Sequence, residues 1–274
     1  MTSWLYAAPE HPLVLPVPAF QDNYLWLLRA PTGPRAAIVD PGDARPVLKA
    51  LEAHKLELAT ILLTHHHADH AGGVAELVAA TGARVVGPRF EAIAGVTEPV
   101  EDGQSVDSGL DGALATVLAV PGHTRGHIAY FFEQLGDDLR PLLFCGDTLF
   151  AAGCGRLFEG TPEQMLASLD RLAALADDTL VYCAHEYTQS NLRFALAAEP
   201  SAPEVAARAT EADAMRAAGR PTVPSSIGIE RRTNPFLRVD QPLVVGAAAA
   251  RLGRAPIDRT ETFATIREWK NSFR

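Results

Sequence analysis

The stretch LLTHHHADHAGG, residues 62–73, places four histidines and an aspartate within six consecutive positions and ends in two glycines. It continues the apolar run ATILLT (59–64), which is typical of a buried strand. If the chain stays extended just beyond this strand, His65, His67 and Asp69 point to one side. Imidazole and carboxylate groups in this arrangement are typical ligands of zinc, and also of iron or manganese.

The other two histidines of this stretch take different places. His66 points to the opposite side of an extended chain, so we expect a role other than metal binding for it. His70 begins a turn into a helix that Gly72 and Gly73 permit. Three ligands on one side and a fourth at the turn therefore predict a metal site directly after the strand.

Three more potential ligands follow apolar runs later in the chain. His123 comes after ATVLAV, Asp147 after LLFCG and His185 after LVYCA. The carboxyl ends of buried strands are where α/β folds place their sites. In total, three histidines could hold one metal, two histidines and Asp69 a second, and Asp147 could bridge them through its two oxygens. We therefore expect two divalent metal ions per chain, zinc before iron or manganese.

The first two thirds of the chain alternate between short apolar runs and helix-like segments, which predicts an α/β fold. The predicted strands are residues 24–28, 36–40, 59–64, 83–87, 115–120, 128–132, 141–146 and 179–184. The predicted helices in this part are residues 44–54, 72–82 and 161–175. A capping box of Thr161 and Gln164 opens the last of these helices.

After residue 187 the strand signals fade, and segments 188–198, 201–219 and 260–273 are typical of helices with polar N-caps. We therefore predict two domains. Residues 1–186 form an α/β domain, and residues 187–274 form a smaller helical C-terminal domain.

The charge of the chain is unevenly distributed. The net charge is −9, but residues 191–274 hold 13 Lys+Arg and 9 Asp+Glu, which leaves 11 and 24 for residues 1–190. An acidic body argues against binding nucleic acid, whereas a basic tail suits an anionic small molecule. No apolar run is long enough to span a membrane, and the proline-broken N-terminus has no basic region typical of a signal peptide. We expect a cytoplasmic protein that does not bind membranes.

The cysteines, and the histidines outside the predicted metal ligands, fit structural roles. No two cysteines stand at C-x-x-C spacing, and Cys145 and Cys183 lie in apolar strand-like runs, which predicts buried thiols. We expect His127 to pack against the site or support it rather than bind metal. We expect His11 and His54 on the surface.

The motifs THHHADHAGG, GHTRGH, GDTLF and HEYT, in this order, resemble those of the metallo-β-lactamase superfamily. This resemblance implies an αββα sandwich, in which two mixed sheets pack face to face, helices lie outside and the metals lie at one edge. A narrower resemblance, from about residue 14 to the C-terminus, is to the hydroxyacylglutathione hydrolase (glyoxalase II) family. The segments that carry it are residues 17–28, 146–161, 183–195, 234–238 and 263–273.

The family resemblance implies how the ligands are shared between the metals. One metal would be held by His65, His67 and His123, and the other by Asp69, His70 and His185, with Asp147 bridging. Among these ligands, we expect Asp69, His70 and Asp147 to be the catalytic residues.

The resemblance also implies that residues 1–186 are the catalytic domain and that residues 187–274 recognise glutathione. Family members use a Lys at the position of Arg156, a Tyr at the position of Phe158, Tyr187, and an Arg and a Lys that Arg267 and Lys270 match. At i, i+3 on a helix, the last two would lie on one face and could hold a carboxylate. Arg156 keeps the positive charge with a different geometry. Phe158 lacks the hydroxyl and therefore any hydrogen bond from it.

The implied activity is hydrolysis of S-D-lactoylglutathione, a small-molecule glutathione thioester, to glutathione and D-lactate. This is the second step of methylglyoxal detoxification. We expect the enzyme to be a monomer. Activated water would attack the thioester carbonyl, and the thiolate would leave without a strong general acid because its pKa is near ~8.5.

Other interpretations share parts of the motif set. A mononuclear iron oxygenase acting on glutathione persulfide is the nearest, although the complete second metal site and the tail favour the hydrolase. An RNA-processing nuclease of the same fold would need a basic body and an RNA-binding insertion. A non-catalytic binding protein would lack a ligand, whereas all seven positions are filled. A β-lactamase would need an export signal.

Overall fold

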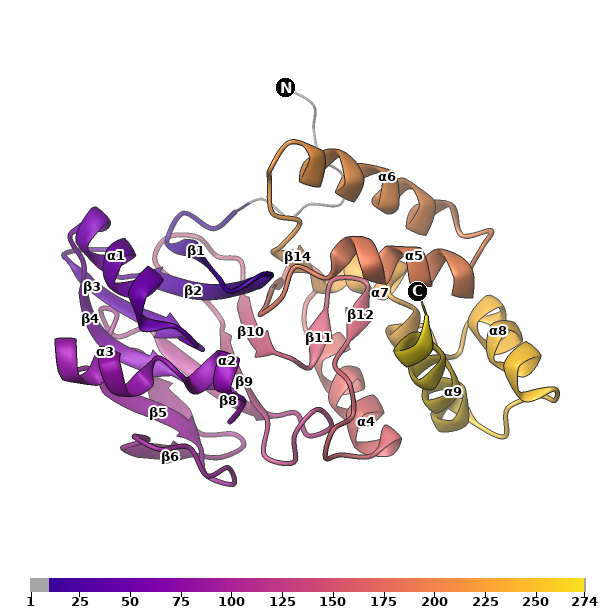
Figure 1. Ribbon diagram of the computed structural model, residues 1–274, viewed down its shortest axis with the longest axis horizontal. Coiled ribbons are helices and arrows are strands. Elements are labelled where there is room, and N and C mark those ends of the chain that lie inside the picture. Colours follow the sequence, from indigo (N-terminus) through magenta and orange to yellow (C-terminus); the bar gives the residue numbers. More distant parts are fainter. Residues whose placement is uncertain (1–9, 274) are drawn as a thin grey trace.

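The computed structural model of the chain describes residues 10–273, which form two mixed β-sheets packed face to face (Figure 1). The first sheet has the strand order β1-β2-β3-β4-β5-β6. Its strands are β1 (Val14–Ala19), β2 (Asn23–Arg29), β3 (Arg35–Val39), β4 (Glu57–Leu62), β5 (Arg84–Pro88) and β6 (Glu98–Val100). The β1–β2 and β2–β3 pairs are antiparallel, and the pairs from β3 to β6 are parallel.

The second sheet has the order β14-β13-β10-β9-β8-β7. Its strands are β7 (Ser105–Asp107), β8 (Leu114–Ala119), β9 (Ile128–Phe132), β10 (Leu142–Gly146), β13 (Leu180–Cys183) and β14 (Ser225–Ser226). Only the β10–β13 pair in this sheet is parallel. A short hairpin of β11 (Leu149–Phe150) and β12 (Gly153–Cys154) stands apart from both sheets.

Strand β2 shows why the strands have nearly continuous apolar sequences. Trp26 and Leu28 belong to the large apolar cluster between the sheets, whereas Leu25 and Leu27 belong to a second cluster on the outer face. Helices α1 (Ala44–His54) and α3 (Val74–Thr81) supply the other side of that second cluster. Because both faces of the strand are covered, the sequence has no polar alternation.

Helices complete the sandwich and form the tail. Helix α4 (Pro162–Ala173) begins with the predicted capping box at Thr161 and packs its apolar side into the large cluster. The tail contains α5 (Thr188–Ala198), α6 (Pro203–Ala217), α7 (Ile227–Thr233), the 3₁₀ turn η1 (Pro235–Leu237), α8 (Pro242–Leu252) and α9 (Arg259–Ser272). The predicted α/β sandwich with a helical tail is confirmed, and Cys145 and Cys183 are buried as predicted. Within the described residues, every helix is too short or too polar to cross a membrane.

Two details differ from the sequence-based expectations. Strand β1 was not predicted, because its prolines at positions 16 and 18 argue against a strand. It tolerates them because it lies at the edge of its sheet. The prediction that His11 lies on the surface is wrong. His11 is 2% exposed because the chain leading into β1 packs it against the loop that holds Asp138, 3.8 Å from its Nε2 atom. His54 is exposed as predicted.

Candidate metal centre and adjoining cavity

The histidine-rich stretch follows β4 and enters the short helix α2 (Ala68–Ala71). The chain is extended only as far as His67, which has φ −60° and ψ 146°. The backbone N–H of His70 donates to the carbonyl oxygen of His67, so a helical turn has begun by then. The expectation that Asp69 lies on an extended segment is therefore wrong. A helical turn instead places Asp69 and His70 side by side.

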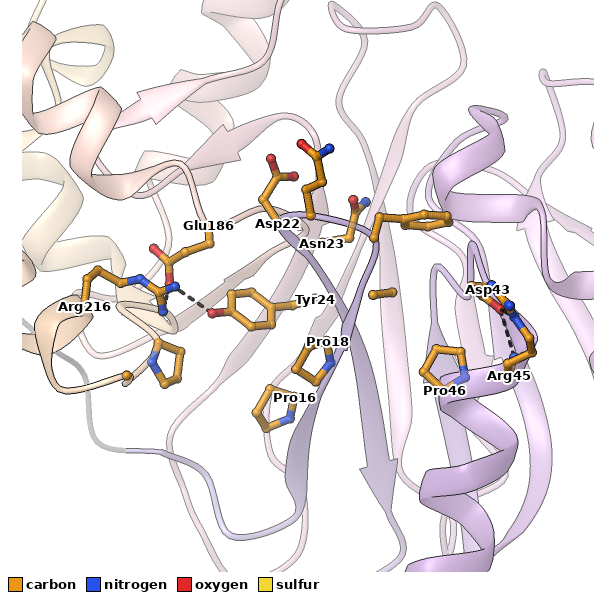
Figure 2. Close-up of a pocket in the computed structure, with 15 residues that line it drawn as sticks. Pro16, Pro18, Asp22, Asn23, Tyr24, Asp43, Arg45, Pro46, Glu186 and Arg216 are labelled. Carbon is orange, nitrogen blue, oxygen red and sulfur yellow. Dashed lines mark hydrogen bonds and ion pairs between the residues drawn. The ribbon is translucent and has the colours of Figure 1, made fainter.

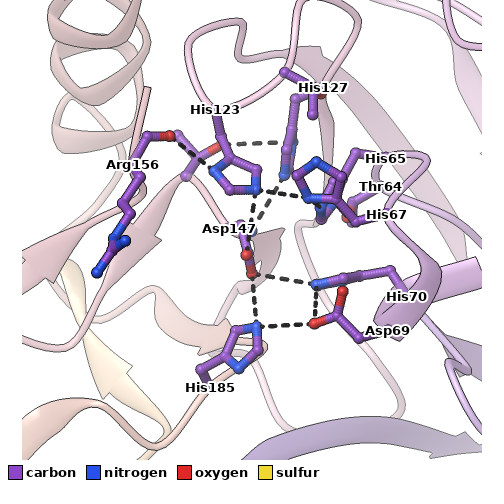
Figure 3. Close-up of polar contacts among 12 residues, drawn as sticks. Thr64, His65, His67, Asp69, His70, His123, His127, Asp147, Arg156 and His185 are labelled. Atoms are coloured by element: carbon purple, nitrogen blue, oxygen red, sulfur yellow. Dashed lines mark hydrogen bonds and ion pairs between the residues drawn. The ribbon is translucent and has the colours of Figure 1, made fainter. Parts of the chain in front are cut away.

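Three imidazoles form what we call the first cluster: His65, His67 and His123. His67 Nδ1 lies 3.1 Å from His65 Nε2 and 3.0 Å from His123 Nε2 (Figure 3). With Zn–N bonds of about 2.0–2.1 Å, the nitrogens of a tetrahedral zinc site lie about 3.3 Å apart. The spacing of the three nitrogens is close to that of a metal site.

Asp69, His70 and His185 form the second cluster, and Asp147 lies between the two clusters. Asp147 Oδ1 lies 3.4 Å from His70 Nε2 and 3.3 Å from His185 Nε2. Its other oxygen, Oδ2, lies 3.4 Å from His123 Nε2. One carboxylate therefore presents one oxygen to each cluster.

A glycine makes this position of Asp147 attainable. Gly146, the last residue of β10, has φ +47°, a conformation that favours glycine. A Cβ atom here would lie 2.3 Å from Thr64 Oγ1 and 2.9 Å from the ring of His127. The strand can therefore turn Asp147 between the clusters only without a side chain at residue 146.

Hydrogen bonds fix the tautomers of four histidines. The Nδ1 atom of His70 donates to Asp40 (3.0 Å), that of His185 to Asp22 (2.8 Å), and that of His123 to the carbonyl oxygen of Arg156 (2.9 Å). The fourth, His65, donates to the hydroxyl of Thr64 (3.0 Å), which itself donates to Asp40. Each Nε2 atom therefore keeps a lone pair directed at the cluster, as metal-binding histidines do.

Without a bound cation, the electrostatics favour an ionised Asp147 and neutral His65 and His123, but a protonated His70. Burial raises the pKa of Asp147, but His70, His185 and His123 outweigh burial and hold it far below the usual range. Burial lowers the pKa of His65 and of His123. Burial also lowers the pKa of His70, yet the surrounding carboxylates raise it to about 9. Metal binding requires neutral imidazoles and ionised carboxylates, so a cation at His70 would displace the proton that the carboxylates favour there.

Two buried atoms in the centre also fit a cation. His70 Nε2 and Asp147 Oδ1 have no hydrogen-bond partner although both are buried. Buried polar atoms are almost always satisfied, and a metal ion would satisfy both of these together. The residues of the two clusters therefore fit a pair of divalent cations.

The motifs in the sequence do not reveal the residues that orient the candidate ligands. Asp40 accepts hydrogen bonds from the backbone N–H of Thr64 and from His70. The side-chain amide of Asn23 donates to Asp69 Oδ2 (3.1 Å), and Asp22 holds His185. Asp40 stands at the end of the predicted strand 36–40, so its place at a strand end was a usable signal.

The two histidines excluded as ligands lie where expected. His66 faces away from the clusters, with Nδ1 2.9 Å from Glu91 Oε2 and Nε2 3.3 Å from Glu159 Oε1. His127 stacks on His65 with ring centroids 4.6 Å apart. Its Nε2 atom accepts a hydrogen bond from the backbone N–H of Asp147. His127 therefore supports the centre without belonging to either cluster.

A cavity of about 440 Å³ opens beside the first cluster and Asp147. All five predicted substrate residues line it: Arg156, Phe158, Tyr187, Arg267 and Lys270. Its volume is in the range of small-molecule sites. Burial, reinforced by neighbouring positive charges, lowers the pKa of Lys270 to about 8. The cavity therefore suits an anionic ligand that ends at the metal centre.

The two C-terminal residues differ in their engagement. Arg267 is buried and donates from its NH1 atom to the carbonyl oxygen of Cys154 (2.7 Å), while its Nε atom has no partner. Lys270 is half-buried and donates to the carbonyl and hydroxyl oxygens of Ser190 (3.1 and 3.0 Å). Arg267 thus fastens α9 to the β11–β12 hairpin, and Lys270 is the more exposed charge.

A second cavity, of about 600 Å³, lies on the other side of the β1–β2 turn (Figure 2). Asp22 and Asn23 line it, and the same two side chains hold His185 and Asp69. Across the cavity the hydroxyl of Tyr24 donates to Glu186. The wall between this cavity and the metal centre is therefore made of residues that orient the ligands.

Comparison with known proteins gives the chain its family. Residues 22–185 match the metallo-beta-lactamase superfamily, and residues 186–273 match the hydroxyacylglutathione hydrolase C-terminus. A hydroxyacylglutathione hydrolase of Dechloromonas aromatica is 53% identical over 270 residues, which cover 94% of this chain and 98% of that protein. Another, of Pseudomonas aeruginosa (strain PAO1), is 54% identical over 258 residues, which again cover 94% of this chain and 98% of that protein. The chain belongs to the hydroxyacylglutathione hydrolase family.

Solved structures are more distant. ETHE1 from Myxococcus xanthus is 27% identical with a TM-score of 0.62, over 90% of this chain and 86% of that one. TTHA1623, crystallised in a di-iron-bound form, is 27% identical with a TM-score of 0.53, over 85% of this chain and 100% of that one. The hydroxyacylglutathione hydrolases are the nearer relatives by identity, and they also share the length of the chain, helical tail included.

The two departures from the hydroxyacylglutathione hydrolase pattern both lie at the cavity wall. Phe158 is 63% exposed, and its ring lies edge-on to His123 and His67 with centroids 5.3 and 5.7 Å away. The carbonyl oxygen of Arg156 accepts a hydrogen bond from His123 Nδ1, and Arg156 also lines the cavity. Both therefore line the cavity beside the first cluster.

Proposed function

We propose that this chain hydrolyses S-D-lactoylglutathione to glutathione and D-lactate, as the second step of methylglyoxal detoxification. The observation that carries the proposal is the position of Asp147. Its two oxygens face two ligand clusters, and it also lines the cation-rich cavity. Membership of the hydroxyacylglutathione hydrolase family supports the same activity.

The proposed metal ligands are His65, His67 and His123 for one ion, Asp69, His70 and His185 for the other, with Asp147 shared. When bound, two divalent ions supply a Lewis acid for the thioester carbonyl and lower the pKa of water toward ~7. We propose zinc as the natural metal, because imidazole-rich ligands suit it, although iron and manganese also accept this set.

The chain itself would bind and orient the glutathione part. Lys270 and Arg156 offer positive charges to the carboxylates of glutathione, and Arg267 adds a buried charge behind them. Tyr187 stacks on His185 with parallel rings 4.7 Å apart and forms the cavity wall next to the second cluster. These contacts would place the thioester against Asp147, where Asp69 and His70 also face the reacting group.

The leaving group explains why no general acid is needed. A thiolate with a pKa near ~8.5 departs without protonation at neutral pH. Asp147 is held ionised by its three histidines, so it can bind a cation but cannot donate a proton. The same site would therefore cleave thioesters better than amides, whose leaving groups require a proton.

The test follows the thioester absorbance of S-D-lactoylglutathione with purified protein of measured zinc content. We expect turnover by the wild-type chain, and we expect Asp147→Ala to abolish it and to lower the zinc content. Wild-type activity in Asp147→Ala would overturn the assignment. Oxygen consumption with glutathione persulfide would instead support the alternative, a mononuclear iron oxygenase, and would come with one iron per chain.

Three smaller parts of the proposal are separate. We propose a monomer, a cytoplasmic location, and a small-molecule substrate with no nucleic acid partner. Light scattering measures the first, cell fractionation the second, and RNA binding at physiological salt the third.

A further inference from the structure

Glu91 lies just after β5, outside every sequence motif, and its side chain is only 3% exposed. Its Oε2 atom accepts hydrogen bonds from the backbone N–H of His66 (2.6 Å) and from His66 Nδ1 (2.9 Å). Its Oε1 atom accepts from the backbone N–H of Gly126 (3.1 Å) and from the hydroxyl of Thr124. One buried carboxylate thus takes four hydrogen bonds from two separate loops.

These two loops carry all three ligands of the first cluster. His66 stands between His65 and His67, and Thr124 follows His123 directly. The loops come from different sheets, since one follows β4 and the other follows β8. Glu91 therefore bridges the two segments. The spacing of these segments sets the distances between the three imidazole nitrogens of the first cluster.

The fit around Glu91 is close. A Cβ atom on Gly126 would lie 2.5 Å from the Cγ atom of Glu91 and 3.0 Å from the backbone of Phe90. The second glycine of GHTRGH is therefore required for the carboxylate to reach Thr124. His66, which serves neither cluster, gains a role as the partner of this carboxylate.

We propose that Glu91 is a positioning residue that sets the metal affinity of the first cluster and leaves the second cluster largely unaffected. The histidines of the second cluster are oriented by carboxylates other than Glu91, with Asp40 on His70 and Asp22 on His185. The inference rests on the proposed metal centre, but it concerns metal affinity rather than turnover.

The experiment titrates zinc into metal-free Glu91→Gln, using a chromophoric chelator as competitor. Glutamine keeps one acceptor oxygen but turns an N–H donor toward one of the two donor pairs, so one side of the bridge is lost. We expect the wild type to bind two zinc ions, and the variant to bind one of them about 10–100-fold more weakly, a typical loss when a partner of a metal ligand is removed.

A second set of variants identifies the weakened site. In the Glu91→Gln background, His185→Ala should remove the remaining tight zinc, whereas His123→Ala should cost no further tight binding. The matched control is Glu159→Gln. Glu159 contacts the same two loops, at His66 Nε2 and the backbone N–H of Arg125, but its side chain is 35% exposed. We expect its zinc titration to match the wild type.

Equal weakening of both zinc ions, or none, in Glu91→Gln would overturn the proposal. Circular dichroism of the metal-free variants checks that they fold. If Glu91→Gln does not fold, Gly126→Ala displaces the same carboxylate sterically and should give the same selective loss. A wild-type chain that binds two zinc ions but leaves S-D-lactoylglutathione intact would refute the proposed function and leave this inference standing.

Discussion

Asp40 connects the two ligand clusters through two neighbouring hydrogen bonds. Its Oδ2 atom lies 3.0 Å from His70 Nδ1 and 2.7 Å from Thr64 Oγ1, which in turn accepts from His65. Asp40 and His70 are almost completely buried. One carboxylate therefore orients a histidine of each cluster.

Replacing Asp40 should weaken both metals together. We expect Asp40→Asn to lower zinc affinity and kcat by about 10–100-fold. Asparagine is neutral and has a single acceptor oxygen, so it cannot replace both carboxylate oxygens that accept from His70 and Thr64. Asparagine tolerates the left-handed backbone of this residue (φ +50°), so the effect will not come from backbone strain. Competitive zinc titration and steady-state kinetics measure both quantities. An unchanged titration would show that Asp40 does not orient the ligands.

The candidate ligands could be picked out from the sequence because each stands at a strand end or in a regular histidine pattern. Asp40 and Asp22 carry a weaker signal, since a single aspartate after a strand or in a turn is common. Glu91 carries none. Its partners come from loops that meet only when β5, β4 and β8 are assembled, and sequence spacing cannot show that.

The fold was predicted best where strands are buried on both faces, as in β2 and β10. The pattern failed for short elements that depend on tertiary contacts. Strand β14 is two residues long and exists because it pairs with β13. Helix α7 is short, and its start is set by the Ser226 side chain, which accepts from the backbone N–H of Ile229.

The lowered pKa of Lys270, about 8, predicts how catalysis depends on pH. As pH rises through this value the ammonium group loses its charge, so its attraction for a carboxylate is present below about pH 8 and lost above it. We expect kcat/KM to fall as pH rises above about 8, because the pH dependence of this ratio reports the pKa values of the free enzyme. This fall is the alkaline limb of the pH profile. In Lys270→Arg the limb should move to higher pH, because arginine stays charged. The surface substitution Lys49→Arg is the control, and a limb that stays in place in Lys270→Arg would contradict the assignment.

Phe158→Tyr should restore a hydroxyl at the mouth of the cavity. One new hydrogen bond to glutathione is worth roughly 0.5–1.5 kcal/mol, so we expect KM to fall about two- to tenfold with little change in kcat. The matched control is Phe90→Tyr, because Phe90 is 73% exposed and does not line this cavity. A KM that rises or stays constant in Phe158→Tyr would indicate that glutathione does not reach this ring.

The tail should contribute to stability through a buried ion pair that also holds the β11–β12 hairpin. Glu230 is 0% exposed and accepts from Arg208 NH2 (2.6 Å), and its other oxygen accepts from the backbone N–H of Ala152 (2.7 Å). Removing one partner of a buried pair leaves an uncompensated charge. We expect Glu230→Ala to lower the free energy of unfolding by about 3–5 kcal/mol in urea denaturation. In the same helix, Arg231 pairs with Asp177 at the surface, so Arg231→Ala should cost about 0–1 kcal/mol. Equal losses in the two variants would show that burial of the Glu230 pair adds nothing to stability.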